Sequence, residues 1–305
     1  MIYLWMLVGF ILLMKGADYF VEGSCSVAKL LKIPSIIIGL TIVSLGTSAP
    51  EAAVSIVAGI NGSNEIALSN VLGSNIFNLL IVIGACATIQ AFPVYKDILK
   101  RDLPINIGTS ILLLIFLLDM KLSRVESIIL LIGMVLYILR LIKNAMNNRT
   151  EEEYETKSPI ISTVYIVLGL VGVIIGGDLV VDNASLIASR WGLSETLIGL
   201  TIVSVGTSLP ELVTSVVAAL KGEPELALGN AIGSCIFNIL FILGISASLS
   251  PIGVIGESII DAIILIVISA IIYVFCSTKA KVHRWEGIVQ ILIYVAYLAY
   301  IIIRN

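Results

Sequence analysis

Residues 39–51, GLTIVSLGTSAPE, decide the fold, because they occur twice. Residues 199–211 read GLTIVSVGTSLPE, so the segment returns 160 positions later with two substitutions. A second segment keeps the same offset: residues 65–80, EIALSNVLGSNIFNLL, return at 225–240 as ELALGNAIGSCIFNIL. The chain is therefore predicted to be a duplicated unit.

The composition indicates the solvent in which this unit folds. Of the 305 residues, 58% are hydrophobic and only 13% are charged. Soluble domains carry about 25% charged residues. We therefore predict an all-α polytopic membrane protein whose surroundings are a lipid bilayer. We expect no nucleic-acid partner, and the sequence does not predict an oligomeric state.

Apolar runs locate the expected membrane crossings. A crossing helix needs about 20 predominantly apolar residues. Ten spans are predicted, five in each half of the chain: 2–22, 35–60, 66–90, 104–119, 124–144, 160–180, 195–220, 225–248, 257–276 and 286–303.

The polar segment AMNNRTEEEYETKS separates the two copies. We therefore expect a first five-helix repeat over 1–144, a cytoplasmic linker over 145–158 and a second five-helix repeat over 159–305. An odd number of spans in each repeat makes the second copy enter the membrane from the opposite side, so the repeats are predicted to be inverted.

Basic residues predict the orientation. The loops after the odd-numbered spans carry thirteen Lys and Arg residues, and the opposite side carries four. Basic residues concentrate in cytoplasmic loops. This predicts a protein of the cell (inner) membrane with both termini extracytoplasmic.

Proline is expected to break the second span. Pro50 has no N–H to donate to the carbonyl four residues back, and its ring disfavours helical geometry at Ala49. Such a break is tolerated in a bilayer only where it lines a cavity within the protein. The helix is predicted to unwind around residues 46–50 and to restart with Pro50 at its first position, and the copy at 206–210 should do the same.

Polar residues fall on single helix faces, because their spacings follow the helical repeat. Four stripes result, and they are expected to meet at the centre of the protein, with Gly73 and Gly233 allowing close backbone approach. The stripes are Ser44, Ser48, Glu51 and Ser55; Ser204, Ser208, Glu211 and Ser215; Asn70, Ser74 and Asn78; and Asn230, Ser234 and Asn238.

The chemistry of these stripes points to a hard cation. Glu51 and Glu211 lie in apolar spans, where an ionised carboxylate is costly unless it is paired. The remaining groups are hydroxyls and amides, with no lysine, arginine or histidine among them. Calcium takes about 6 to 8 oxygen ligands, and sodium accepts similar ones. The absence of histidine and thiol pairs argues against zinc or copper.

The paired motifs GTSAPE and GTSLPE, each followed by a G-S-x-x-F-N segment, resemble the two alpha-repeats of the sodium/calcium exchanger family. The resemblance implies a ten-helix inverted repeat, discontinuous helices at a central site, and exchange of sodium for calcium by alternating access. It implies an antiporter, not an enzyme, with no cofactor beyond the transported ions. The ion ligands that it implies are Glu51, Glu211, Thr47, Ser48, Thr207, Ser208, Ser74, Ser234, Asn78 and Asn238, with backbone carbonyls near Ser44 and Ser204.

One position departs from part of that family. Potassium-dependent members and some prokaryotic ones resemble this chain but have aspartate where Asn238 stands. Two acidic ligands then remain, which weakens the case for potassium cotransport and leaves proton participation and stoichiometry open.

Other polar residues fit less specific roles. Asp18 and Asp178 are copies of each other and are read as helix-end or packing groups rather than ligands. Asn70 and Asn230 could equally be hydrogen-bonding links between helices.

Other functions remain open on sequence grounds. A calcium/proton antiporter is the nearest alternative, and a passive cation channel could share the same oxygen-lined path. A membrane-embedded phosphohydrolase would need lysine or arginine to hold phosphate, and no basic residue lies near the stripes.

Overall fold

The computed structural model describes residues 2–60, 64–147, 157–191 and 204–304. The described part of the first half consists of helices α1 (Ile2–Leu31), α2 (Ser35–Ile38), η1 (Gly39–Val43), α3 (Ser44–Thr47), α4 (Ala49–Ile60), α5 (Asn64–Phe77), η2 (Asn78–Val82), α6 (Ile83–Ile89), η3 (Ile98–Asp102), α7 (Leu103–Leu117) and α8 (Arg124–Asn147). The second half has α9 (Pro159–Arg190), α11 (Ser204–Thr207), α12 (Leu209–Leu220), α13 (Pro224–Phe237), η5 (Asn238–Leu243), α14 (Gly244–Leu249), α15 (Gly256–Ser277), η6 (Thr278–Ala280) and α16 (Arg284–Arg304).

Seven helices of the described residues are long and apolar enough to cross a membrane. The segments Ser35–Thr47 and Ala49–Ile60, bent by 49° at their junction, make an eighth if they form one crossing. Two of the predicted spans are not among these eight: α7 has 15 residues, and the span expected at 195–220 begins outside the described residues. The chain is thus a helical membrane protein, and the count of ten crossings stays a prediction.

The helices α1 and α9 are longer than the predicted spans. α1 has 30 residues and α9 has 32, whereas the apolar runs suggested 2–22 and 160–180. Hydropathy marks where a helix is apolar, but backbone hydrogen bonding continues into the polar residues that follow. The added turns end in basic residues, Lys29 in α1 and Arg190 in α9.

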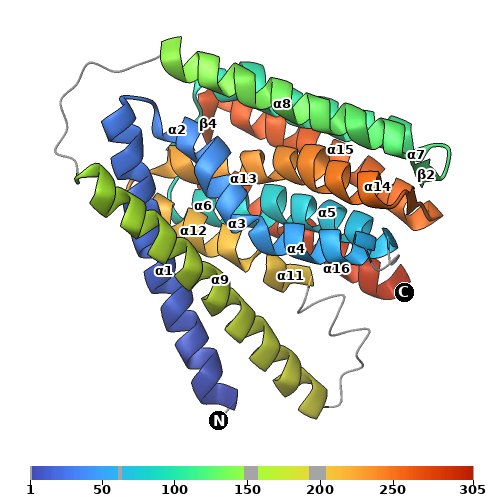
Figure 1. The fold of residues 1–305 in the computed structure, drawn as a ribbon, viewed down its shortest axis with the longest axis horizontal. Helices are drawn as coiled ribbons and strands as arrows, with labels where there is room; N and C mark the ends of the chain where they lie inside the picture. The colour runs from blue at the N-terminus through green and yellow to red at the C-terminus, as the bar shows by residue number, and fades with distance from the viewer. Residues whose placement is uncertain (1, 61–63, 148–156, 192–203, 305) are drawn as a thin grey trace.

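Burial divides the helices into a centre and a periphery (Figure 1). The segments Ile66–Ile89 and Pro224–Leu249 are 72% and 78% buried within their most apolar windows, against 22% to 33% for the other five long helices. Because they are the most buried, these two spans form the core, and both carry the G-S-x-x-F-N segments. α8 and α15 lie along one side of it.

Helices α1 and α9 lie against each other along most of their length and run obliquely to the core helices (Figure 1). Glycines allow this contact: a Cβ on Gly16 would lie 2.6 Å from the backbone nitrogen of Val173, and a Cβ on Gly23 would lie 2.8 Å from the carbonyl oxygen of Ser162. Small residues in membrane helices permit such close backbone approach. The two helices therefore form a tightly packed pair.

Two short antiparallel β pairs join the halves of the chain. β1 (Phe92–Pro93) pairs with β4 (Lys281–Val282), and β2 (Lys121–Leu122) pairs with β3 (Ile252–Gly253). Adding 160 to the first residue of β1 gives that of β3, and adding it to the first residue of β2 gives that of β4. Each pair is thus the other with the two halves exchanged.

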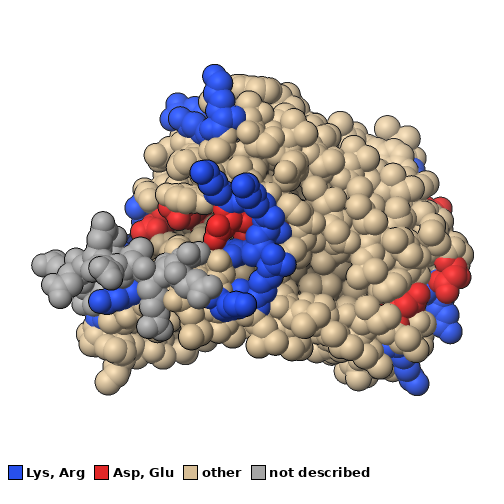
Figure 2. All heavy atoms as spheres, turned by 90° about the horizontal axis from the view of Figure 1, so that it is seen from above, with Lys and Arg blue, Asp and Glu red and all other residues tan. Residues whose placement is uncertain are grey.

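Charged side chains gather in two regions of the face drawn in Figure 2. Figure 2 shows one cluster of Lys and Arg beside a few acidic residues, a smaller charged group at the opposite end, and uncharged surface between them. An uncharged band flanked by charged ends suits a chain that spans a bilayer.

Candidate functional site

The two copied motifs place their glutamates just after a break in helical geometry. Ser48 has φ −81° and ψ 10°, and Ser208 has φ −92° and ψ 6°. Both lie in the sparsely populated region between helix and strand. Helix resumes at Ala49 and at Leu209, so each motif proline is the second helical residue, whereas the sequence predicted it to be the first. The unwinding predicted over residues 46–50 is confined to Ser48, because Gly46 and Thr47 remain in helix α3.

The glutamates are buried and are linked crosswise between the halves. Glu51 and Glu211 are both 0% exposed. Ser48 Oγ donates to Glu211 Oε1 at 2.8 Å, and Ser208 Oγ donates to Glu51 Oε1 at 2.8 Å. Each motif therefore supplies the hydroxyl donor for the other motif's carboxylate, which brings the two acids to one place.

Asparagines hold the backbone around these acids. Asn230 Nδ2 donates to the carbonyl oxygen of Glu211 at 3.4 Å and to Ser215 Oγ at 2.9 Å. Its Oδ1 accepts a 3.1 Å hydrogen bond from Thr47 Oγ1. The amide thus ties α13 to α12 and to the opposite motif, so interhelical linkage describes this residue.

The copy of this arrangement lies in the other half. Asn70 Nδ2 donates to the carbonyl oxygen of Glu51 at 3.4 Å and to Ser55 Oγ at 3.1 Å. Thr207 Oγ1 donates to Asn70 Oδ1 at 3.5 Å. Spacing by four residues placed both asparagines on the polar stripes, but their attachment to the glutamate backbone was not predictable from spacing.

The third and eighth predicted spans contribute their polar groups at π-helical turns. η2 begins at Asn78 and η5 begins at Asn238. Short π-helical segments occur frequently at functional sites. Ser74, one turn before Asn78, donates to Glu51 Oε1 at 3.5 Å.

Several polar atoms in this region are buried without a hydrogen-bond partner. They are Glu51 Oε2, Glu211 Oε2, Ser234 Oγ, Asn238 Oδ1, and both Oδ1 and Nδ2 of Asn78. Leaving a polar or charged group buried and unpaired is costly. Five of these six atoms are oxygens, and a cation bound among them would restore their missing partner.

The structure buries ten of the twelve predicted site residues to 1% exposure or less: Ser44, Thr47, Ser48, Glu51, Ser74, Asn78, Ser208, Glu211, Ser234 and Asn238. Thr207 is partly buried. The side chain of Ser204 lies outside the described part of the structure. Ser44 Oγ donates to the carbonyl of Thr41 at 3.1 Å, so its hydroxyl serves its own helix.

No basic side chain of the described residues forms an ion pair with either glutamate. Within the same residues no group of three or more His, Cys, Asp or Glu side chains is arranged so that it could hold a metal ion. The four cysteines are buried and unpaired. The donor set is therefore two carboxylates supplemented by hydroxyl and amide oxygens, as expected for a hard monovalent or divalent cation.

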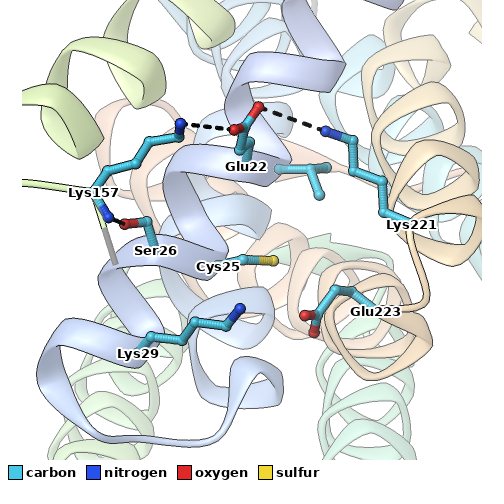
Figure 3. Close-up of a pocket in the computed structure, with 8 residues that line it drawn as sticks. Glu22, Cys25, Ser26, Lys29, Lys157, Lys221 and Glu223 are labelled. Carbon is cyan, nitrogen blue, oxygen red and sulfur yellow. Dashed lines mark hydrogen bonds and ion pairs between the residues drawn. The ribbon is translucent and has the colours of Figure 1, made fainter. Parts of the chain in front are cut away.

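A separate cavity of about 440 Å³ lies between α1, Lys157 in the segment that leads into α9, and the turn after α12 (Figure 3). Glu22 bridges two lysines there: Lys157 Nζ lies 3.0 Å from Glu22 Oε1, and Lys221 Nζ lies 3.9 Å from Glu22 Oε2. Lys221 also pairs with Asp18 at 2.6 Å, which agrees with a packing role for that aspartate. None of the predicted site residues lines this cavity.

The sequence matches the model of a family described as "Sodium/calcium exchanger protein" over residues 1–143 and 161–303. A candidate antiporter, CaxA of Alkalimonas amylolytica, is 40% identical over 96% of each chain. The sodium/calcium exchanger MaX1 of Methanosarcina acetivorans is 34% identical over 97% of each chain.

A solved structure of the sodium-calcium exchanger NCX_Mj, soaked with sodium and strontium, superimposes with a TM-score of 0.88. It is 32% identical in sequence, and the match covers 98% of this chain and 99% of that one. The two relatives and the solved structure thus each match this chain over nearly its whole length.

Proposed function

This chain belongs to the sodium/calcium exchanger protein family, and from that premise we propose that it is an antiporter that exchanges sodium for calcium across the membrane. The observation that carries the proposal is the crosswise bonding of the glutamates. Ser48 bonds Glu211, and Ser208 bonds Glu51, so two buried carboxylates share one site. Each keeps one oxygen without a partner.

Charge balance favours calcium as one of the cargo ions. Two carboxylates neutralise one divalent cation, and hydroxyl and amide oxygens complete a hard-cation shell. We assign the ligands to Glu51, Glu211, Thr47, Ser48, Thr207, Ser208, Ser74, Ser234, Asn78 and Asn238, with carbonyls near Ser44 and Ser204 as further candidates. The unpaired oxygens of Ser234 and Asn238 support this assignment.

The proposed architecture is ten crossings in two inverted repeats, 1–144 and 159–305, joined by a cytoplasmic linker over 145–158. Contacts that recur with the halves exchanged support the repeat. Arg284 Nη2 donates to the carbonyl of Ile89, and Arg124 Nη2 donates to that of Leu249. The bend of 49° after Thr47 supports a discontinuous helix at the site. Inverted repeats with broken helices at mid-membrane are typical of secondary transporters.

Exchange follows from the cost of moving charge through the bilayer. An empty site would carry two negative charges across a medium of low dielectric constant, which is unfavourable. Bound calcium, or a set of sodium ions, neutralises the glutamates and lets the site change its facing. The ions act by shifting the populations of outward and inward states. Because the return step needs the other ion, the result is coupled exchange without chemistry on the cargo.

The proposed location is the cell membrane, with both termini extracytoplasmic. Thirteen basic residues in the loops predicted to be cytoplasmic, against four opposite, support this orientation.

Calcium-45 uptake into proteoliposomes tests the proposal when sodium, potassium and proton gradients are imposed separately. We expect uptake driven by a sodium gradient and little effect of potassium. Uptake driven by a pH gradient in sodium-free vesicles would instead identify a calcium/proton antiporter. Calcium flux that needs no opposing ion gradient would identify a channel.

A further inference from the structure

Asn75 lies on α5, next to Ser74 but off the polar stripe, and is 0% exposed. Both ends of its amide are engaged. Asn75 Nδ2 donates to the backbone carbonyl oxygen of Cys235 at 3.1 Å, and Asn75 Oδ1 accepts a hydrogen bond from Asn238 Nδ2 at 3.0 Å. The side chain thus joins α5 to the start of η5.

The direction of these bonds is fixed by chemistry. A backbone carbonyl oxygen can only accept, so the NH₂ group of Asn75 must face Cys235. The Oδ1 of Asn75 must then face Asn238, and Asn238 must donate to it from its own NH₂ group. The Oδ1 of Asn238 is therefore turned away from Asn75, and it is buried without a partner.

The equivalent position in the other half cannot do the same. Cys235 stands 160 residues after Asn75. Its thiol points to the carbonyl oxygen of Asn75, 3.7 Å away, and a thiol is only a weak hydrogen-bond partner. Both polar atoms of Asn78 remain unpaired, so nothing selects which end of that amide faces the site.

We propose that Asn75 is a positioning residue that holds the Asn238 amide with its oxygen toward the cargo cation. The inference rests on the proposed cation site. An amide oxygen attracts a cation and an amide NH₂ repels it, so fixing the orientation in advance lowers the cost of binding. The site then has one preset amide ligand, Asn238, and one that orients when the ion arrives, Asn78.

The main test is calcium affinity of the intact protein in detergent, measured by equilibrium binding of calcium-45. Asn75→Leu keeps a similar volume but removes both hydrogen bonds. We expect its calcium dissociation constant to rise about tenfold, because the Asn238 amide is no longer held with its oxygen toward the cation. In an Asn238→Ala background, Asn75→Leu should change the dissociation constant no further, because the amide that it orients is gone.

Asn106→Leu is the matched control. Asn106 is also a buried asparagine that bonds across helices, with Nδ2 donating to Ser269 Oγ at 3.3 Å, but it is not among the proposed ligands. Its replacement should lower the melting temperature and leave calcium affinity unchanged. If Asn75 were only a link between helices, Asn75→Leu would behave like Asn106→Leu: it would lower the melting temperature and leave the calcium dissociation constant unchanged.

Cys235→Asn supplies the reciprocal test and does not depend on Asn75→Leu folding. An amide at position 235 can accept from Asn78 Nδ2, so we expect tighter calcium binding than in the wild type. Unchanged affinity in both Asn75→Leu and Cys235→Asn, with a wild type that binds calcium, overturns the positioning role. A wild type that binds no calcium overturns the proposed function instead.

Discussion

Ser48 and Glu211 are 163 residues apart, yet Ser48 Oγ donates to Glu211 Oε1 at 2.8 Å. The bond between Ser208 and Glu51 has the same length. A hydroxyl from one half therefore completes the carboxylate of the other, so neither half contains a whole site. Because the two bonds are equivalent, substituting either glutamate, or either serine, should change calcium binding and uptake to a similar extent.

Replacing either glutamate by glutamine should abolish sodium-driven calcium uptake. Glu51→Gln and Glu211→Gln keep the side-chain shape but leave one negative charge, too little to balance a calcium ion. We expect uptake in proteoliposomes to fall at least about a hundredfold, the scale of a lost charged contact. Glu126→Gln is the control, because Glu126 only caps α8 through Ser123. Sodium-driven uptake that persists in either site variant would contradict the two-carboxylate site.

Ser48→Ala and Ser208→Ala should weaken calcium binding to a similar extent. Each removes one hydroxyl that donates to a buried carboxylate at the same distance. A hydrogen bond to a charged group contributes about 1.5 to 3 kcal/mol, so each dissociation constant should rise roughly tenfold or more. Equilibrium calcium-45 binding measures this. An effect confined to one of the two serines would argue against a shared site.

The sequence predicted the parts of this site that depend on local chemistry. Pro50 within an apolar run predicted a break, and the helix bends there by 49°. Spacings of three and four residues predicted which polar groups share a face, and ten of them are now buried together with the glutamates. These features follow from one helix at a time, which is why the pattern of residues contains them.

Contacts between helices could not be predicted from the sequence in the same way. The polar stripes did not indicate that Ser48 would bond Glu211. Which stripe lies opposite which depends on how the helices pack, and the spacing within one helix does not contain that information. Asn75 lies one residue off its stripe, so periodicity gave it no role, although its amide orients Asn238. The length of α1 was also missed, since an apolar run ends before the helix does.

Gly16→Ala should destabilise the protein by disrupting the pair of α1 and α9. A Cβ at Gly16 would lie 2.6 Å from the backbone nitrogen of Val173, and backbone cannot move aside as a side chain can. Overpacking of this kind costs about 1 to 3 kcal/mol. Thermal unfolding in detergent measures the loss.

Gly108→Ala is the comparison, because a Cβ at Gly108 has no neighbouring atom within 4 Å. Alanine is favoured over glycine within a helix by about 1 kcal/mol, so this variant should unfold at the same or a higher temperature. Equal destabilisation by both substitutions would show that the α1–α9 contact is not the cause.

Glu22→Gln should lower the pKa of Lys157, which lines the cavity of Figure 3 and pairs with Glu22 there. A hydrogen bond and charge attraction from the Glu22 carboxylate raise the pKa of Lys157 above its ordinary value. This contribution to stability is present below the ordinary lysine pKa and is lost as the pH rises through the raised one. In the variant, NMR of ¹³C-methylated lysines should show the Lys157 pKa falling toward the ordinary value. An unchanged pKa would mean that Glu22 is not its partner in solution.

Competition between the two cargo ions at the glutamates tests the central claim most directly. Calcium-45 binding to the purified protein should saturate, should be displaced by sodium, and should disappear in both Glu51→Gln and Glu211→Gln while those variants keep their thermal stability. Calcium binding that sodium does not displace, or that survives the loss of either carboxylate, would contradict a single site that holds the two ions in turn.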